Sequence, residues 1–80
     1  MEEKVRISIL LEIYGNLLTE KQYEFMDYYY NQDLSLSEIG DNNDITRQAV
    51  RTILLKSKKK LEETNADKKI LKKIKQQIDF

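Results

Sequence analysis

The sequence of 80 residues predicts an all-α fold. Proline is absent, and Gly15 and Gly40 are the only glycines, so few positions interrupt a helix. Apolar residues recur at spacings of three and four, whereas the two-residue alternation that marks a half-buried strand is missing. These observations indicate about five helices in a single domain over residues 1–80. A chain of this size buries only about 60% of the surface of its unfolded form, so self-association would add stability.

The composition excludes several classes of function. Without cysteine or histidine, the chain has no disulfides, no thiolate nucleophile and none of the usual zinc ligands. Its fourteen carboxylates are spread over helix surfaces, and it has no glycine-rich phosphate loop. We therefore expect no enzyme, no metal and no cofactor. The acidic N-terminus differs from a secretory signal, and no apolar run approaches the roughly 20 residues that span a bilayer, which predicts a cytoplasmic protein without membrane insertion.

The first predicted helix covers about residues 3–18 and carries two apolar stripes. The stripe expected to be buried consists of Ile7, Leu10, Leu11, Tyr14, Leu17 and Leu18. The second stripe, Val5, Ile9 and Ile13, is wider than one small core needs, so we interpret it as a protein-interaction surface. Its cover is either the C-terminal helix of the same chain or another subunit in a homodimer, and the sequence favours neither.

The second predicted helix covers about residues 20–30. Thr19 and Gln22 have the spacing of a capping box at its start. Along the helix, Tyr23, Met26 and Tyr30 share one face, and Phe25 and Tyr29 share the adjoining one. We expect two rings of the Tyr28–Tyr30 run to lie near the core and about one to be exposed. Exposed tyrosines could stack on bases, but a core role with a solvated hydroxyl is the favoured interpretation.

The segment Leu34–Val50 predicts the core of a helix-turn-helix that covers about residues 34–55. Its first helix opens at Leu34 or Ser35 and buries Leu36 and Ile39. Gly40 is small where the two helices approach, and Ile45 fills the corner. Asp41–Asp44 are expected to form the turn, because asparagine tolerates the left-handed backbone conformation. The Thr46 hydroxyl then caps the second helix.

That second helix, about residues 47–63, has an inward and an outward face. The inward face is predicted to carry Val50, Ile53, Leu54, Ser57 and Leu61. Arginine can hydrogen-bond to guanine and glutamine to adenine, while lysines neutralise phosphates. We therefore predict nucleic-acid-binding residues Thr46, Arg47, Gln48, Arg51, Thr52, Lys56 and Lys59. Leu55 lies in the middle of this face and is typical of a protein contact, so it is assigned to protein interaction.

Charge is distributed unevenly although the net charge is zero. Residues 1–34 carry three basic and seven acidic side chains, whereas residues 56–80 carry nine lysines and four acidic side chains. The last predicted helix, about residues 67–79, is amphipathic and basic. Packing against the first or fourth helix is favoured over binding to a membrane surface, because its apolar face has no aromatic ring before Phe80. The basic tail would also suit a polyanionic partner.

Four segments in order resemble the YlxM family of bacterial helix-turn-helix proteins: Leu17–Gln22, the aromatic cluster to Tyr30, Asp33–Ile39 and Thr46–Val50. The resemblance covers about residues 5–63. It implies a fold like region 4 of sigma factors and a role in DNA binding or regulation in the signal recognition particle pathway, because the family's genes accompany those of the particle. Thr46–Val50 matches the family's Ser-Arg-Gln-Ala-Val. The chain departs from the family at Asn43, where a large apolar residue is usual, and in its shorter C-terminus.

Three functions follow from these residues. The first is a non-enzymatic, nucleic-acid-binding regulator associated with components of the signal recognition particle. The second is a sequence-specific transcription regulator that acts as a dimer. The third is a protein-interaction adaptor that does not bind nucleic acid. DNA, RNA and protein all remain possible ligands at this point.

Overall fold

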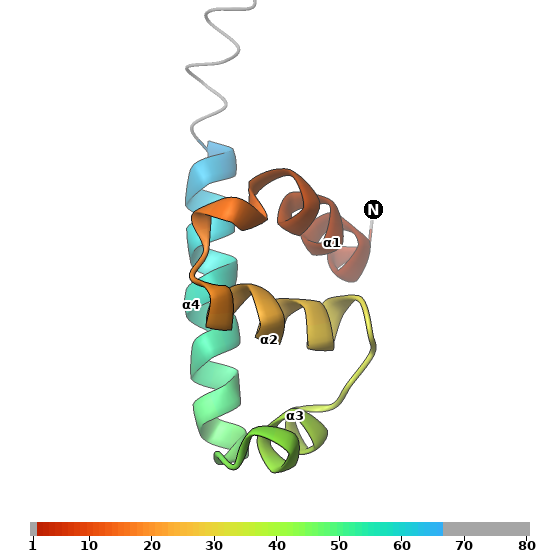
Figure 1. Ribbon diagram of the computed structural model, residues 1–80. Helices are drawn as coiled ribbons and strands as arrows, with labels where there is room; N and C mark the ends of the chain where they lie inside the picture. The colour runs from red at the N-terminus through yellow and green to blue at the C-terminus, as the bar shows by residue number, and fades with distance from the viewer. Residues whose placement is uncertain (1, 67–80) are drawn as a thin grey trace, which may run out of the picture.

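A computed structural model describes residues 2–66 of the chain. Four α-helices follow in order, α1 (Glu3–Tyr14), α2 (Glu20–Tyr30), α3 (Leu36–Asn43) and α4 (Arg47–Ala66), with a short 3-10 helix η1 (Gly15–Leu17) after α1. The predicted all-α class is confirmed. About five helices were expected, but the described residues hold four α-helices, and the helix expected at 67–79 lies outside them. Figure 1 shows α1, α2 and α3 along the length of α4, which contacts all three.

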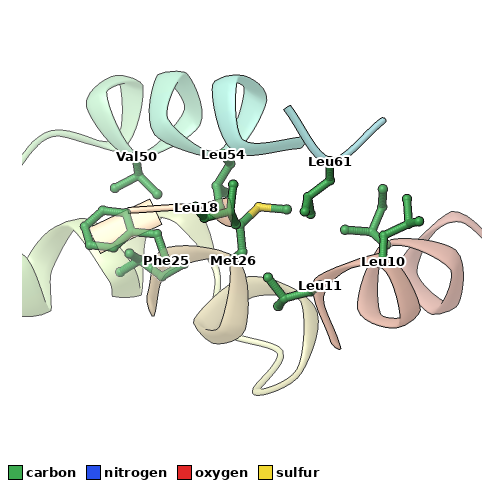
Figure 2. Close-up of a cluster of buried hydrophobic side chains, with 10 residues drawn as sticks. Leu10, Leu11, Leu18, Phe25, Met26, Val50, Leu54 and Leu61 are labelled. Atoms are coloured by element: carbon green, nitrogen blue, oxygen red, sulfur yellow. The ribbon is translucent and has the colours of Figure 1, made fainter. Parts of the chain in front are cut away.

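One hydrophobic core joins the helices along the inward face of α4. Figure 2 shows Val50, Leu54 and Leu61 of α4 pointing toward side chains of the first two helices. The core residues with almost no exposed surface are Ile7, Leu11, Phe25, Met26, Ile39, Val50 and Leu61. Ser57 is also fully buried, and its hydroxyl donates to the Ile53 carbonyl at 2.7 Å. The predicted inward face of this helix is therefore confirmed.

Side-chain capping fixes where α2 and α3 begin. The Thr19 hydroxyl accepts from the Gln22 amide at 3.1 Å, and the Gln22 side chain accepts from the Thr19 amide. Ser35 and Glu38 form the same reciprocal pair at the start of α3. Each pair satisfies two backbone donors that a helix start leaves free. The first of these capping boxes was predicted; the second makes Ser35 the cap and Leu36 the first helical residue.

The first helix is shorter than predicted, and this changes which side chains are buried. It ends at Tyr14 instead of Leu18, and the 3-10 geometry of η1 turns the following residues out of phase with it. Leu17 was expected in the core but is 46% exposed. Tyr23 was expected on a core-facing side of α2 and is 42% exposed. The rings of Tyr28, Tyr29 and Tyr30 are all half-buried, so the expected exposed member of that run is absent.

The turn between α3 and α4 lies later in the chain than predicted. Residues 41–43 are the last turn of α3, so the expected turn at 41–44 is wrong for all but its final residue. Asp44 adopts the left-handed conformation, with φ of 57°, that was expected of an asparagine. At the other end of α4, the helix continues to Ala66 instead of stopping near residue 63.

Candidate nucleic-acid interface

A close backbone approach sets the geometry of the helix-turn-helix. A Cβ placed on Gly40 would lie 2.7 Å from the Ile45 carbonyl oxygen, so a larger residue would require the backbone to shift. The Ile45 amide donates to the Gly40 carbonyl at 3.0 Å, which ties the turn to the end of α3. Ile45 is half-buried and packs against the core. The predicted roles of Gly40 and Ile45 in holding α3 against α4 are thus confirmed.

The first two turns of α4 present polar side chains to solvent. The Thr46 hydroxyl accepts from the Ala49 amide at 3.1 Å and caps the helix, as predicted. Arg47, Gln48 and Arg51 are exposed, and neither arginine belongs to any ion pair among residues 2–66. These three side chains line a groove with Ser35 and two residues of the first turn of α3, Leu36 and Ser37. The groove therefore combines two guanidinium groups, an amide and two serine hydroxyls.

Farther along α4, the remaining predicted contacts lie on the same exposed face. Thr52 is exposed, and its hydroxyl donates to the Gln48 carbonyl at 3.0 Å, so its oxygen can only accept from a ligand. Lys56 and Lys59 are exposed. Lys58 differs because its ammonium group pairs with the Glu3 carboxylate of α1. This hydrogen bond raises the pKa of Lys58 and lowers the pKa of Glu3, and it commits Lys58 to a contact within the chain.

Leu55 interrupts the polar face of α4. It is 53% exposed and borders a second groove with Tyr29, Leu36 and Lys58. Arg51 lines both grooves, so the apolar and the basic parts of this surface are continuous. Exposing the apolar side chain of Leu55 to water is not favourable, so this side chain is available for an apolar contact.

The other predicted interaction stripe lies on α1, apart from α4. Val5, Ile9 and Ile13 are between 40 and 59% exposed, while Ile7, Leu10 and Leu11 of the same helix form its core face. The structure therefore separates the predicted site residues into two surfaces. One is the outward face of α4 with Leu55, and the other is the outward face of α1.

Two residues of the groove on α4 were missed by the sequence analysis. Ser35 and Ser37 had no assigned site role, although they line the groove with Arg47 and Arg51. Their signal was the capping pair Ser35 and Glu38, which marks where α3 starts. The turn between α3 and α4 determines which end of α3 lies beside Arg47 and Arg51. The spacing of residues in the sequence does not specify the geometry of that turn.

Two further kinds of feature are absent from residues 2–66. This part of the chain holds no group of three acidic side chains that could bind a metal ion. Its helices also include none that is both long enough and apolar enough to cross a membrane.

Comparisons with known proteins support a helix-turn-helix assignment. All 80 residues match a family model named UPF0122 and described as "Putative helix-turn-helix protein, YlxM / p13 like". A UPF0122 protein of Clostridium kluyveri is 61% identical over 54 residues, which are 68% of this chain and 49% of that protein. One from Clostridium perfringens is 43% identical over 92% of this chain and 66% of its own length. One from Clostridium acetobutylicum is 42% identical over the whole chain and 69% of its own length.

These relatives are longer than the chain. The match spans about half of the Clostridium kluyveri protein and about two thirds of the other two. No solved structure matches the chain. The family assignment therefore depends on sequence, and the interface described above depends on the geometry of α3 and α4.

Proposed function

We propose that this chain, which belongs to the UPF0122 family of YlxM/p13-like helix-turn-helix proteins, is a non-enzymatic regulator that binds nucleic acid through the outward face of α4. The observation that carries the proposal is the groove of Arg47, Gln48 and Arg51 beside the first turn of α3. In a helix-turn-helix, the second helix enters the major groove and its N-terminal residues contact base edges. We assign that role to the exposed residues at the start of α4, Arg47, Gln48 and Arg51.

Each side chain has a separate role in this proposal. Arg47 and Arg51 carry the charge and contact phosphates or guanine, and Gln48 contacts adenine. The Ser37 hydroxyl, Thr46 and Thr52 offer neutral contacts to the backbone of the nucleic acid. Lys56 and Lys59 extend the contact along α4 toward further phosphates.

Within residues 2–66, the outward face of α4 carries few cations that lie outside ion pairs, which predicts weak binding with modest salt dependence. If Arg47 and Arg51 contact phosphates, with or without the two lysines, between two and four phosphates are neutralised. The logarithm of the association constant should then fall with the logarithm of salt with a slope between about −2 and −4. A slope of −2 corresponds to about a 16-fold loss of affinity between 50 and 200 mM salt.

The test replaces both arginines and follows fluorescence anisotropy of a labelled duplex. Arg47→Ala with Arg51→Ala should weaken binding about tenfold at low salt and reduce the salt slope by about 2. The matched control is Lys21→Ala with Lys60→Ala, which removes the same charge from exposed positions outside the groove. If the two double variants lost affinity equally, the effect would come from net charge and not from the groove, which would contradict the proposed interface.

The family resemblance extends the proposal to the signal recognition particle. We propose that the RNA of that particle, or DNA, is the nucleic acid that α4 contacts, and within this proposal the protein acts in the cytoplasm. Anisotropy with the particle's RNA, a random duplex and a single strand separates these ligands. A sequence-specific transcription regulator would instead prefer one duplex sequence by about 10³-fold or more over others.

Leu55 favours a second candidate, an adaptor that binds protein through the same face. A leucine 53% exposed between Arg51 and Lys59 suits a protein contact better than a phosphate backbone. The variant Leu55→Asp should abolish binding of the protein subunit of the signal recognition particle, with the helical circular dichroism unchanged. Retained binding in that variant would exclude the contact through Leu55.

A further inference from the structure

The junction of α1 and α2 forms a second open surface, which the proposed function does not use. Two hollows along this junction share Leu11, Glu12 and Tyr23 and so make one continuous depression, named here the α1–α2 groove. Its exposed apolar side chains are Val5, Ile9, Ile13 and Tyr23. Its glutamates are Glu2, Glu12, Glu20 and Glu24, and it is also lined by Lys4 and Asp33, which form an ion pair with each other. The groove is therefore apolar inside and acidic along its borders.

The apolar residues of the α1–α2 groove are unusual for a surface that faces water. Ile13 is 59% exposed, and Val5 and Ile9 lie on the same stripe at a spacing of four residues. A contiguous apolar stripe with polar borders marks a contact surface, whereas single exposed leucines do not. An occupant with an apolar face would bury all three side chains at once.

Charge decides the kind of occupant. The four border glutamates are exposed and belong to none of the ion pairs among residues 2–66. Symmetric packing of two α1–α2 grooves would bring the border glutamates of both copies into one acidic interface, which is unfavourable. A helix with apolar residues on one side and lysines beside them would match both the stripe and its borders.

We propose that residues 67–80 of the same chain occupy the α1–α2 groove. This segment combines the apolar residues Ile70, Leu71, Ile74 and Ile78 with the lysines Lys68, Lys69, Lys72, Lys73 and Lys75. On a helical projection, the apolar residues share one stripe, and Lys73 and Lys75 fall on its opposite borders. The lysines can then face the glutamates while the isoleucines cover Val5, Ile9 and Ile13.

The end of α4 lies close enough to α1 for this arrangement. The Arg6 guanidinium of α1 donates to the Glu62 carboxylate of α4 at 2.7 Å, and α4 ends four residues later at Ala66. If residues 67–69 form the turn, a helix over residues 70–78 would be about 14 Å long, which fits within the roughly 18 Å of the 12 residues of α1. Because the segment is tethered, its effective concentration at the groove is on the order of millimolar, which favours the same chain over a second copy.

Disulfide trapping tests the contact directly because the chain has no native cysteine. Three double variants combine Ile74→Cys with Val5→Cys, Ile9→Cys or Ile13→Cys. A disulfide needs Cβ atoms about 3.5–4.5 Å apart, so at least one pair should oxidise within the chain several-fold faster than a control pair. The matched control combines Ile74→Cys with Leu55→Cys. Leu55 is exposed to a similar degree as Val5, Ile9 and Ile13, but it lies on α4. Mass spectrometry at low micromolar concentration identifies the product.

The result expected is a monomeric, internally linked product from a groove pair and little from the control. A disulfide formed only between chains would overturn the proposal in favour of a second copy. Oxidation at the control rate in all three pairs would show that the segment does not lie in the α1–α2 groove.

A charge exchange tests why this segment is the occupant. In the fastest groove pair, Glu12→Lys with Glu24→Lys should slow oxidation several-fold at low salt, and adding Lys73→Glu with Lys75→Glu should restore it. A rate unchanged by the first exchange, or not restored by the second, would overturn the assignment by charge. Nucleic-acid binding through α4 is measured separately, so failure here leaves the proposed function intact.

Discussion

The outward face of α4 and the α1–α2 groove expose apolar side chains to a similar degree but differ in charge. Leu55 of α4 is 53% exposed, and Ile13 of α1 is 59% exposed. Beside Leu55 lie Arg51 and Lys58, whereas Ile13 lies between glutamates of α1 and α2. Apolar exposure alone would assign both surfaces to the same kind of partner. The neighbouring charges distinguish the two surfaces, and our proposals accordingly assign a polyanion or a protein to α4 and a lysine-rich segment to the groove.

The largest expected change in stability tests whether Leu55 contributes to the folded core as its neighbour Leu54 does. Leu54→Ala should lower the free energy of unfolding by about 2–5 kcal/mol, because Leu54 is buried against the core. Its exposed neighbour gives the matched control, and Leu55→Ala should change stability by less than about 0.5 kcal/mol. Urea unfolding followed by circular dichroism measures both. A loss of more than about 1 kcal/mol in Leu55→Ala would mean that α4 is covered at this face.

Alanine at each of the two glycines should have different effects in the two regions. In Gly40→Ala the new methyl group meets the Ile45 carbonyl oxygen, part of the backbone, so we expect a loss of about 1–3 kcal/mol. In Gly15→Ala it meets the Tyr23 ring at 2.6 Å, but this half-exposed side chain can move. Gly15 has ordinary helical dihedral angles, and alanine favours a helix over glycine by about 1 kcal/mol. We therefore expect little net change there, and equal losses in urea unfolding would contradict this distinction.

The sequence predicted the features that depend on neighbouring residues. Thr19 with Gln22 and Thr46 were recognised as caps because the donor and acceptor lie three residues apart. The inward face of α4 was also predicted, because one uninterrupted helix keeps its phase from Val50 to Leu61. The groove beside Arg51 was predicted only in part. Its serines belong to α3, and the angle between two helices is not a local property.

Two predictions from the sequence were wrong: the burial of Leu17 and the residue that adopts the left-handed conformation in the turn between α3 and α4. The 3-10 turn at Gly15–Leu17 rotates Leu17 out of the core, and the apolar spacing did not indicate it. The left-handed residue of the turn is Asp44, although Asn42 and Asn43 were the expected candidates. The Asn43 side chain donates to the Ile39 carbonyl at 2.8 Å and stays exposed at the end of α3. Both errors concern geometry that several neighbouring residue types could adopt.

The smallest expected effect concerns the ion pair that joins α1 to α4. In this pair, the hydrogen bond from Lys58 of α4 lowers the pKa of Glu3 of α1 below the ordinary value of 4.5 in the folded state. The stabilisation is therefore present above pH 4.5 and is lost as the pH falls through the lower, folded-state pKa. Between pH 6 and pH 3, the urea midpoint of Glu3→Gln should fall less than that of the unchanged protein. Lys58→Gln removes the other side chain of the pair, so the fall in its urea midpoint should be reduced in the same way.

The most direct test of the central claim, that α4 contacts nucleic acid while the α1–α2 groove does not, is amide chemical-shift mapping during titration with a duplex. Binding through α4 should shift the amides of Ser35–Ser37 and Arg47–Leu55 and leave those of Val5, Ile9 and Ile13 unchanged. Shifts centred on α1, or a titration in which α4 does not respond to DNA or to the RNA of the signal recognition particle, would contradict it.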